Sequence, residues 1–254
     1  MTFFIDIADK RNQILKALLA EKKQETQEIC FMEKAVKNDV FIFAPNKKFD
    51  DDFLTSLTPN TNLICGALSE NQQKILKTKN IQHLNVLSDE VFAIKNSWLT
   101  AEGILAIILE KSPESIYESK ILILGSGRVG KATAAIFAKM GLINFSLVSN
   151  SVQNFAQTFL FSSTNFFAQE HLNNLKNFDI IINTIPEQTI PENLYNTIKP
   201  NCLFLEIASI QSINVNIAKF NYVLCPALPQ KYSCISAAKV FLEAIEKMLK
   251  LTFW

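Results

Sequence analysis

The sequence predicts an α/β protein in which a doubly wound parallel sheet is preceded by a second, smaller α/β domain. Runs of β-forming residues alternate with amphipathic helical segments along the chain, an order typical of parallel strands joined by crossover helices. The 254 residues exceed the usual size of one domain. Three of the six glycines fall within six positions, directly after one β-forming run. We therefore expect two domains, residues 1–96 and 97–254.

The first domain is predicted as a small α/β unit built from short strands. A helix over 69–80 has Ser69 as a good N-cap residue and Asn80 as a plausible stop. An earlier helix is expected over 9–22. The expected strands cover residues 2–7, 27–32, 39–44, 61–68 and 81–87.

The second domain is expected to begin with a helix in the segment "NSWLTAEGILAIILEKSPES", with Asn96 or Ser97 as its N-cap. This helix has almost no polar face, so we expect it to be buried on several sides. A C-terminal helix over about 234–250 is expected to pack back toward the first domain. The remaining pattern predicts strands at 120–124, 145–149, 179–185, 202–208 and 222–227, helices at 127–140 and 191–199, and a polar run at 149–157.

Composition limits the classes of function. With 25 basic and 24 acidic residues, the chain has no charge excess that would suggest binding to nucleic acid or to an acidic membrane surface. The N-terminus lacks the order of a signal peptide, and the uninterrupted apolar stretches are shorter than the ~18 residues of a membrane span. Five scattered cysteines without a CxxC pair argue against disulfides or a metal site. We expect a cytoplasmic protein that acts on a small molecule.

The clearest motif is "GSGRVG" at residues 125–130, a G-x-G-x-x-G pattern between a predicted strand and a predicted helix. This context is typical of a Rossmann-type dinucleotide site. Gly125 would allow the tight turn, Gly127 the approach of a pyrophosphate, and Gly130 close packing of helix on strand. The residues between them, Ser126, Arg128 and Val129, are assigned to the same site. The alternative is a tight strand-to-helix turn that binds nothing.

The segment that follows the next strand favours NADP over NAD. An acidic residue about 20 positions beyond the motif usually binds the ribose 2′-hydroxyl of NAD, but no charged residue occurs between Lys139 and Glu170. Ser149, Asn150 and Ser151 can donate hydrogen bonds to a 2′-phosphate, although no arginine is present there to clamp it. NAD stays open as the alternative cofactor.

Further contacts are expected where other strands end, because open parallel sheets bind ligands at their carboxyl edge. Thr184, Ile185 and Pro186 are predicted to line the nicotinamide ribose, with Ser209 near the ring; ordinary turns are the alternative. A cleft between domains is the default ligand site. The substrate residues are therefore expected near the domain boundary, at Asn96, Ser97, Thr100 and Glu102, although local helix stability could also explain those residue types.

The motifs "NSWLTAEG", "LGSGRVG", "DIIINTIP", "EIAS" and "CPALP", in this order, resemble the A subunit of dipicolinate synthase. The resemblance implies a two-domain Rossmann-type dehydrogenase that oxidises dihydrodipicolinate to dipicolinate with NADP during sporulation. It also implies a homo- or hetero-oligomeric enzyme whose partner is a flavoprotein-like B subunit.

Two positions depart from the pattern of that family. Ser209 is followed by "IQSI" where the family has Arg-Pro-Gly-Gly, and Ile235 stands where a lysine is expected. A substrate with two carboxylates requires cationic partners, for which Lys231 and Arg128 are the remaining candidates. Two alternatives therefore stay open: a related dehydrogenase of another substrate, and a non-catalytic nucleotide-binding subunit. The sequence identifies no catalytic base.

Overall fold

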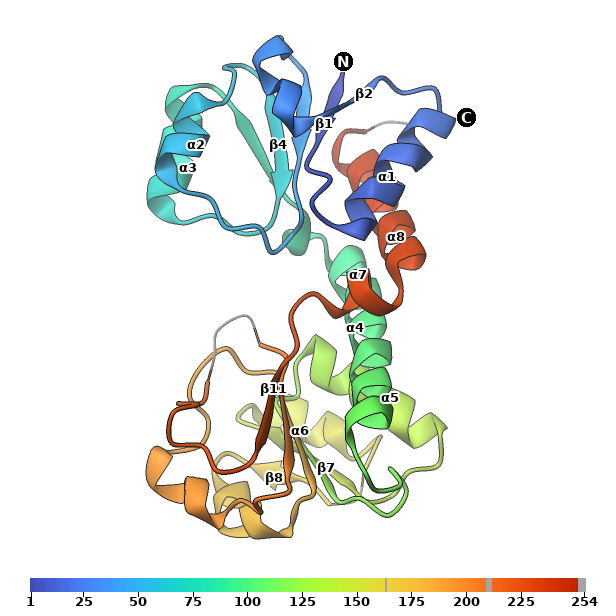
Figure 1. The fold of residues 1–254 in the computed structure, drawn as a ribbon, viewed down its shortest axis with the longest axis vertical. Coiled ribbons are helices and arrows are strands. Elements are labelled where there is room, and N and C mark those ends of the chain that lie inside the picture. The colour runs from blue at the N-terminus through green and yellow to red at the C-terminus, as the bar shows by residue number, and fades with distance from the viewer. Residues whose placement is uncertain (163, 209–211, 251–254) are drawn as a thin grey trace. The chain divides into compact units, whose positions relative to one another are not determined.

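The chain folds into two compact units, each built on its own parallel sheet (Figure 1). The computed structural model describes residues 1–162, 164–208 and 212–250. Unit 1 contains Met1–Asn96 together with the segment that begins at Pro229, and unit 2 contains Ser97–Leu228. This division differs from the predicted ranges in its last segment, which the sequence pattern assigned to the second domain.

Unit 1 is a five-stranded parallel sheet in the order β2-β1-β3-β4-β5. Its strands are β1 (Phe3–Ile5), β2 (Thr26–Glu28), β3 (Val40–Ile42), β4 (Asn62–Cys65) and β5 (Gln82–Asn85). Its connections contain α1 (Lys10–Glu21), α2 (Asp51–Ser56) and α3 (Glu70–Thr78), and the 3-10 segments η1 (Ile29–Lys34) and η2 (Val86–Ser88). Ser69 caps α3, as predicted, and the structure adds a capping box between Ser69 and Gln72.

The two faces of this sheet bury different residues, because successive side chains of a strand point to opposite faces. On one face Phe3 and Ile5 pack with α1 and with the C-terminal helix α8 (Cys234–Met248), whose Phe241 is fully buried. On the other face Phe4 and Phe41 pack with α2 and α3. Helix α8 thus completes the core of unit 1. For this reason the segment that begins at Pro229 belongs to unit 1. Figure 1 shows α1 and α8 side by side.

Unit 2 contains a six-stranded parallel sheet in the order β11-β10-β9-β6-β7-β8. From its other edge this order corresponds to the 3-2-1-4-5-6 arrangement of dinucleotide-binding domains. The strands are β6 (Ile121–Leu124), β7 (Phe145–Ser149), β8 (Phe166–Phe167), β9 (Ile180–Asn183), β10 (Leu203–Glu206) and β11 (Asn221–Leu224). The helices are α5 (Arg128–Lys139), α6 (Val152–Thr158), and the 3-10 segments η3 (Glu170–Asn177) and η4 (Glu192–Thr197); α7 (Leu228–Tyr232) leads to α8. The predicted α/β fold class is confirmed.

Some predicted elements differ in type. The strand expected over 27–32 ends at Glu28 and continues as η1, and the polar run after β7 contains α6. The helix expected over 191–199 is the 3-10 segment η4. Pro191 is its N-cap residue in extended conformation, and Pro200 disfavours helical conformation at Lys199, so the segment cannot extend to the predicted end.

The prediction that Asn96 or Ser97 caps a helix is wrong. Helix α4 (Glu90–Lys111) begins earlier, where the Asp89 carboxylate accepts a hydrogen bond from the Phe92 amide at 2.9 Å. Asn96 and Ser97 lie in its second turn, and Glu102 lies near its middle rather than in its first turns. Leu99, Ala101 and Ile107, which point in different directions around the helix, are buried, whereas Leu109 is exposed.

Among the described residues, α4 is the one helix long and apolar enough to cross a membrane by length and composition. Its most apolar window has a mean hydropathy of 1.4, and 56% of that window is buried within the protein. Such burial suits a core helix, so α4 is weak support for a membrane span.

Candidate functional site

The glycine motif forms the turn between β6 and α5 at the carboxyl edge of the unit 2 sheet. Gly125 has φ of +101°, and a Cβ there would lie 2.5 Å from Thr184 Oγ1. A Cβ on Gly130 would lie 1.9 Å from the carbonyl oxygen of Gly125. Protein atoms alone therefore require glycine at these two positions.

Gly127 differs from the other two glycines of the motif, because no described protein atom requires a glycine at this position. Its φ is −74°, which any residue adopts, and a Cβ on it would meet no atom within 4 Å. It is the exposed N-cap residue of α5 and provides no side-chain cap. Open space thus adjoins a helix N-terminus, where amide groups and the helix dipole favour an anion.

Two buried serines connect the glycine turn to the end of β7. Ser126 Oγ donates to Ser149 Oγ at 2.7 Å, and Ser149 Oγ donates to the carbonyl oxygen of Ser151 at 3.1 Å. The single hydroxyl proton of Ser149 is thus used within the protein. Exposed Asn150 and Ser151 are the remaining predicted polar contacts for a ligand on this segment, and Ser151 also caps α6.

The sequence interpretation missed a cation close to this segment. Lys131, in the first turn of α5, donates from Nζ to Asn154 Oδ1 at 2.8 Å and to Gln157 Oε1 at 2.6 Å. Both acceptors are neutral amides on α6, and no carboxylate pairs with Lys131 within the part of the chain that the structure describes. The amides therefore hold a positive charge beside the turn that follows β7.

The neighbouring strands β9 and β10 end at the same edge, since β6, β9 and β10 are adjacent and parallel. Thr184 donates from Oγ1 to the Leu124 carbonyl oxygen at 2.8 Å, and Ile185 lies against Gly125. The predicted residues Thr184 and Ile185 are thus placed beside the glycine turn, and Pro186 follows them in the chain. Their contact with a nicotinamide ribose stays a prediction.

A buried polar network supports the turn at residues 184–186. No pattern in the sequence indicates this network. The side-chain amide of Asn183 donates to Glu206 Oε1 at 2.7 Å and to the Ile185 carbonyl oxygen at 2.9 Å. Glu206 Oε2 accepts from the amide of Ser212 at 2.9 Å and from its hydroxyl. Asn183 and Glu206 are fully buried, so this network fixes the backbone at Ile185 after β9 and holds Ser212 against the end of β10.

The predicted substrate residues lie along α4. Ser97 and Thr100 are buried, Asn96 is half-buried and Glu102 is exposed. Their role with a substrate stays a prediction, and Ser209 lies outside the described residues.

The two cationic candidates are both surface residues. Arg128 is exposed in the first turn of α5, and exposed Lys231 lies over the Tyr232 ring, 4.8 Å from its centroid. Ile235 is also exposed, in the first turn of α8.

Burial shifts the pKa values of both histidines and of two cysteines toward their uncharged forms. Burial lowers the pKa of His83 and His171, although a backbone hydrogen bond to each partly opposes this shift. Burial also raises the pKa of the Cys65 and Cys202 thiols to about 12, so neither is a thiolate near neutral pH. No group of three or more metal-ligating side chains occurs among the described residues.

The strand order and the glycine turn of unit 2, with a second parallel-sheet unit, define the two-domain fold of Rossmann-type dehydrogenases. No family model matches the chain. A curated relative, the A subunit of dipicolinate synthase from Bacillus subtilis (strain 168), is 27% identical over 165 residues, covering 62% of this chain and 54% of that protein. The match thus spans about half the length of the relative. The predicted resemblance to this family is confirmed.

Solved structures support the same fold over nearly the whole chain. The A subunit of dipicolinate synthase from Bacillus halodurans has a TM-score of 0.83 at 17% identity, covering 98% of this chain and 97% of that one. A transhydrogenase from Sinorhizobium meliloti has a TM-score of 0.71 at 12% identity, covering 98% and 93%. A D-lactate dehydrogenase from Treponema pallidum has a TM-score of 0.60 at 13% identity, covering 98% and 96%. At these identities the likeness establishes the fold.

Proposed function

We propose that this chain is an NAD(P)-dependent oxidoreductase that binds its dinucleotide at the turn between β6 and α5. Gly127 is the observation that carries the proposal. A strand-to-helix turn that binds nothing explains Gly125 and Gly130, whose absent side chains avoid protein atoms, but it gives Gly127 only the role of an N-cap residue, which serine, asparagine or aspartate would fill better. A pyrophosphate beside the open N-terminus of α5 does explain it, because any side chain there would occupy the space of the ligand.

For the reaction we propose the oxidation of dihydrodipicolinate to dipicolinate, in sporulation and together with a flavoprotein-like B subunit. The similarity to the A subunit of dipicolinate synthase supports this choice. A bound nicotinamide would accept the hydride. Because a dihydropyridine becomes aromatic when it loses hydride, the protein mainly has to orient the two rings. The turn at 184–186, fixed by Asn183 and Glu206, is the part of unit 2 suited to that orientation. Five free cysteines agree with a cytoplasmic location.

Two alternatives keep the dinucleotide site but change the activity. The exposed Ile235, in place of a lysine, removes a cation expected for a dicarboxylate substrate, which favours a related dehydrogenase of another substrate or a non-catalytic nucleotide-binding subunit. Mixing the protein with its B subunit, NADP and dihydrodipicolinate tests the reaction, with a rise in dipicolinate absorbance expected. A protein that binds NADPH but yields no dipicolinate would contradict this substrate.

We further propose NADP as the cofactor, with Lys131 as the charged partner of the 2′-phosphate. Replacing Lys131 with Met should weaken NADPH binding by about tenfold or more and leave NADH binding unchanged, because only NADPH carries the additional phosphate. Fluorescence titration of both reduced cofactors measures the two affinities. Lys139→Met, at the other end of α5, is the matched control and should change neither. Equal losses for NADPH and NADH in Lys131→Met would contradict the assignment.

A further inference from the structure

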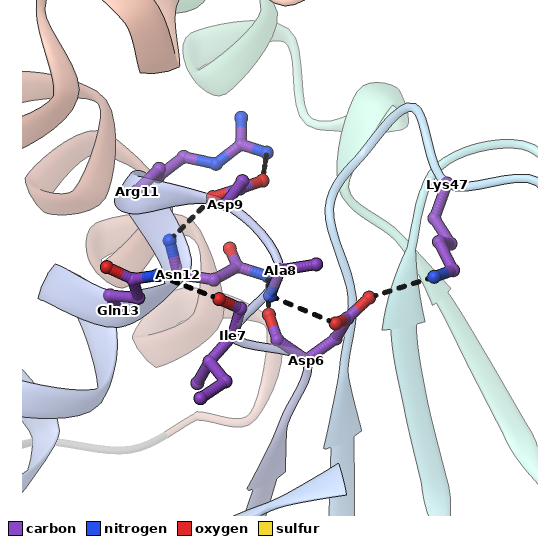
Figure 2. Close-up of polar contacts among 8 residues, drawn as sticks. All are labelled: Asp6, Ile7, Ala8, Asp9, Arg11, Asn12, Gln13 and Lys47. Atoms are coloured by element: carbon purple, nitrogen blue, oxygen red, sulfur yellow. Dashed lines mark hydrogen bonds and ion pairs between the residues drawn. The ribbon is translucent and has the colours of Figure 1, made fainter.

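Unit 1 has a topological switch point of its own at the carboxyl edge of its sheet. In the order β2-β1-β3-β4-β5, the chain leaves β1 toward one side and returns to the other side for β3. At such a switch point the loops diverge, and open parallel sheets bind ligands there. Figure 2 shows the polar side chains at this point: Asp6 follows β1, Asp9, Arg11 and Asn12 belong to the start of α1, and Lys47 comes from the loop after β3.

The loop between β1 and α1 is held in one conformation by its own polar groups. Asp6 pairs with Lys47 across the switch point, with 3.1 Å between Oδ2 and Nζ, and it accepts a hydrogen bond from the Ala8 amide at 3.2 Å. The side-chain amide of Asn12 donates to the Asp6 carbonyl oxygen at 2.8 Å. Asp9 caps α1 by accepting from the Asn12 amide at 2.8 Å. The loop is therefore preorganised.

Arg11, in the first turn of α1, has a guanidinium whose hydrogen-bonding groups are only partly used, although its carbon lies over the Phe241 ring, 5.4 Å from the centroid. Only 6% of the residue is exposed, yet among the described residues its five-donor guanidinium makes a single hydrogen bond, from Nη2 to Asp9 Oδ2 at 3.1 Å. Its Nε is buried without a partner there, as is Oδ1 of the adjacent Asn12. Burial lowers the pKa of Arg11, and the nearby Asp9 only partly offsets this effect. Burying a guanidinium with unused donors is costly, so this position is suited to an anionic group that accepts those hydrogen bonds.

We propose that this switch point binds a carboxylate group of the substrate, with Arg11 as its main partner and Lys47 as a second cation. The proposal rests on the oxidoreductase function proposed above, and it supplies a cationic partner that "IQSI" and Ile235 do not provide. A carboxylate fits better than a phosphate. The planar donors of a guanidinium can bind either group, but the neighbouring Asp6 and Asp9 repel the single charge of a carboxylate less than the two charges of a phosphate dianion.

The test is a calorimetric titration of the full chain with pyridine-2,6-dicarboxylate. The wild type should bind it, Arg11→Met should bind about tenfold more weakly or worse, and Arg11→Lys should fall between them because it retains charge without the planar donors. The uncharged pyridine-2,6-dicarboxamide should not bind. Lys10→Met, which removes the exposed neighbouring cation of α1, is the control and should match the wild type.

Circular dichroism establishes that each variant is folded. If Arg11→Met does not fold, Lys47→Met, whose side chain is 41% exposed, provides the same test and should also weaken binding. A folded Arg11→Met with wild-type affinity, or a wild type that does not bind the dicarboxylate, would overturn the proposal. NADPH binding is measured separately and should be unchanged in all variants. A wild type that binds the dicarboxylate but not NADPH would support this site and contradict the proposed function.

Discussion

Gly127→Val is expected to reduce NADPH binding by about a hundredfold or more while leaving the protein folded. The valine side chain would project into the open space at the N-terminus of α5, where the pyrophosphate would lie, and would separate the phosphate oxygens from the helix amides. The lost electrostatic contacts involve a charged ligand, for which single hydrogen bonds contribute about 1.5–3 kcal/mol each. Fluorescence titration of NADPH measures the effect.

Stability should change little in the same variant. A Cβ at position 127 would meet no atom of the described residues within 4 Å, and the φ of −74° suits an L-residue. Loss of unfolded-chain entropy favours the variant by about 0.4–1 kcal/mol, and the poorer N-cap offsets part of this gain. Gly130→Ala is the contrasting variant, because its Cβ would lie 1.9 Å from the Gly125 carbonyl oxygen. It should be destabilised by about 1–3 kcal/mol or more. Undiminished NADPH binding by Gly127→Val would place the ligand elsewhere.

Glu206→Ala should lower the free energy of unfolding by about 3 kcal/mol or more. The substitution removes both carboxyl oxygens from a fully buried site and leaves the donors of Asn183 and Ser212 without their acceptor. Each buried unsatisfied group costs about 1–3 kcal/mol. Because the network fixes the 184–186 turn, NADPH binding should weaken as well. Urea denaturation measures the change in stability.

The matched control for this network is Glu192→Ala. Glu192 is exposed and accepts one hydrogen bond from Asn214 at 3.0 Å, so its removal should change stability by at most about 0.5 kcal/mol. A loss of less than about 1 kcal/mol in Glu206→Ala would show that the network is not needed to hold the edge of the sheet.

The features predicted correctly are those encoded by residues close together in the sequence. The run at 120–124, the glycines at 125, 127 and 130 and the helix that follows define strand, turn and helix within about 20 residues. Alternating strands and helices then imply parallel pairing. Ser69 is a similar case, because a capping box involves only four consecutive residues.

The features that were missed depend on contacts between distant segments. Lys131 belongs to α5, but its side chain reaches Asn154 and Gln157 of α6. A search for cations among the residues that follow β7 in the sequence therefore does not find it. In the sequence Arg11 is an ordinary residue of an amphipathic helix. In the structure Phe241 of the distant helix α8 covers it, with the ring centroid 5.4 Å from the guanidinium carbon. The start of α4 was misplaced because Asp89 and Asn96 are equally good N-cap types, and the local sequence did not distinguish them.

The central claim is that a dinucleotide lies at the turn between β6 and α5. A crystal structure of the chain with NADPH tests it most directly. We predict the pyrophosphate against Gly127 and the first amides of α5, with the 2′-phosphate within hydrogen-bonding distance of Lys131 Nζ. A dinucleotide bound at another place, with the space beside Gly127 filled by protein atoms, would contradict this account.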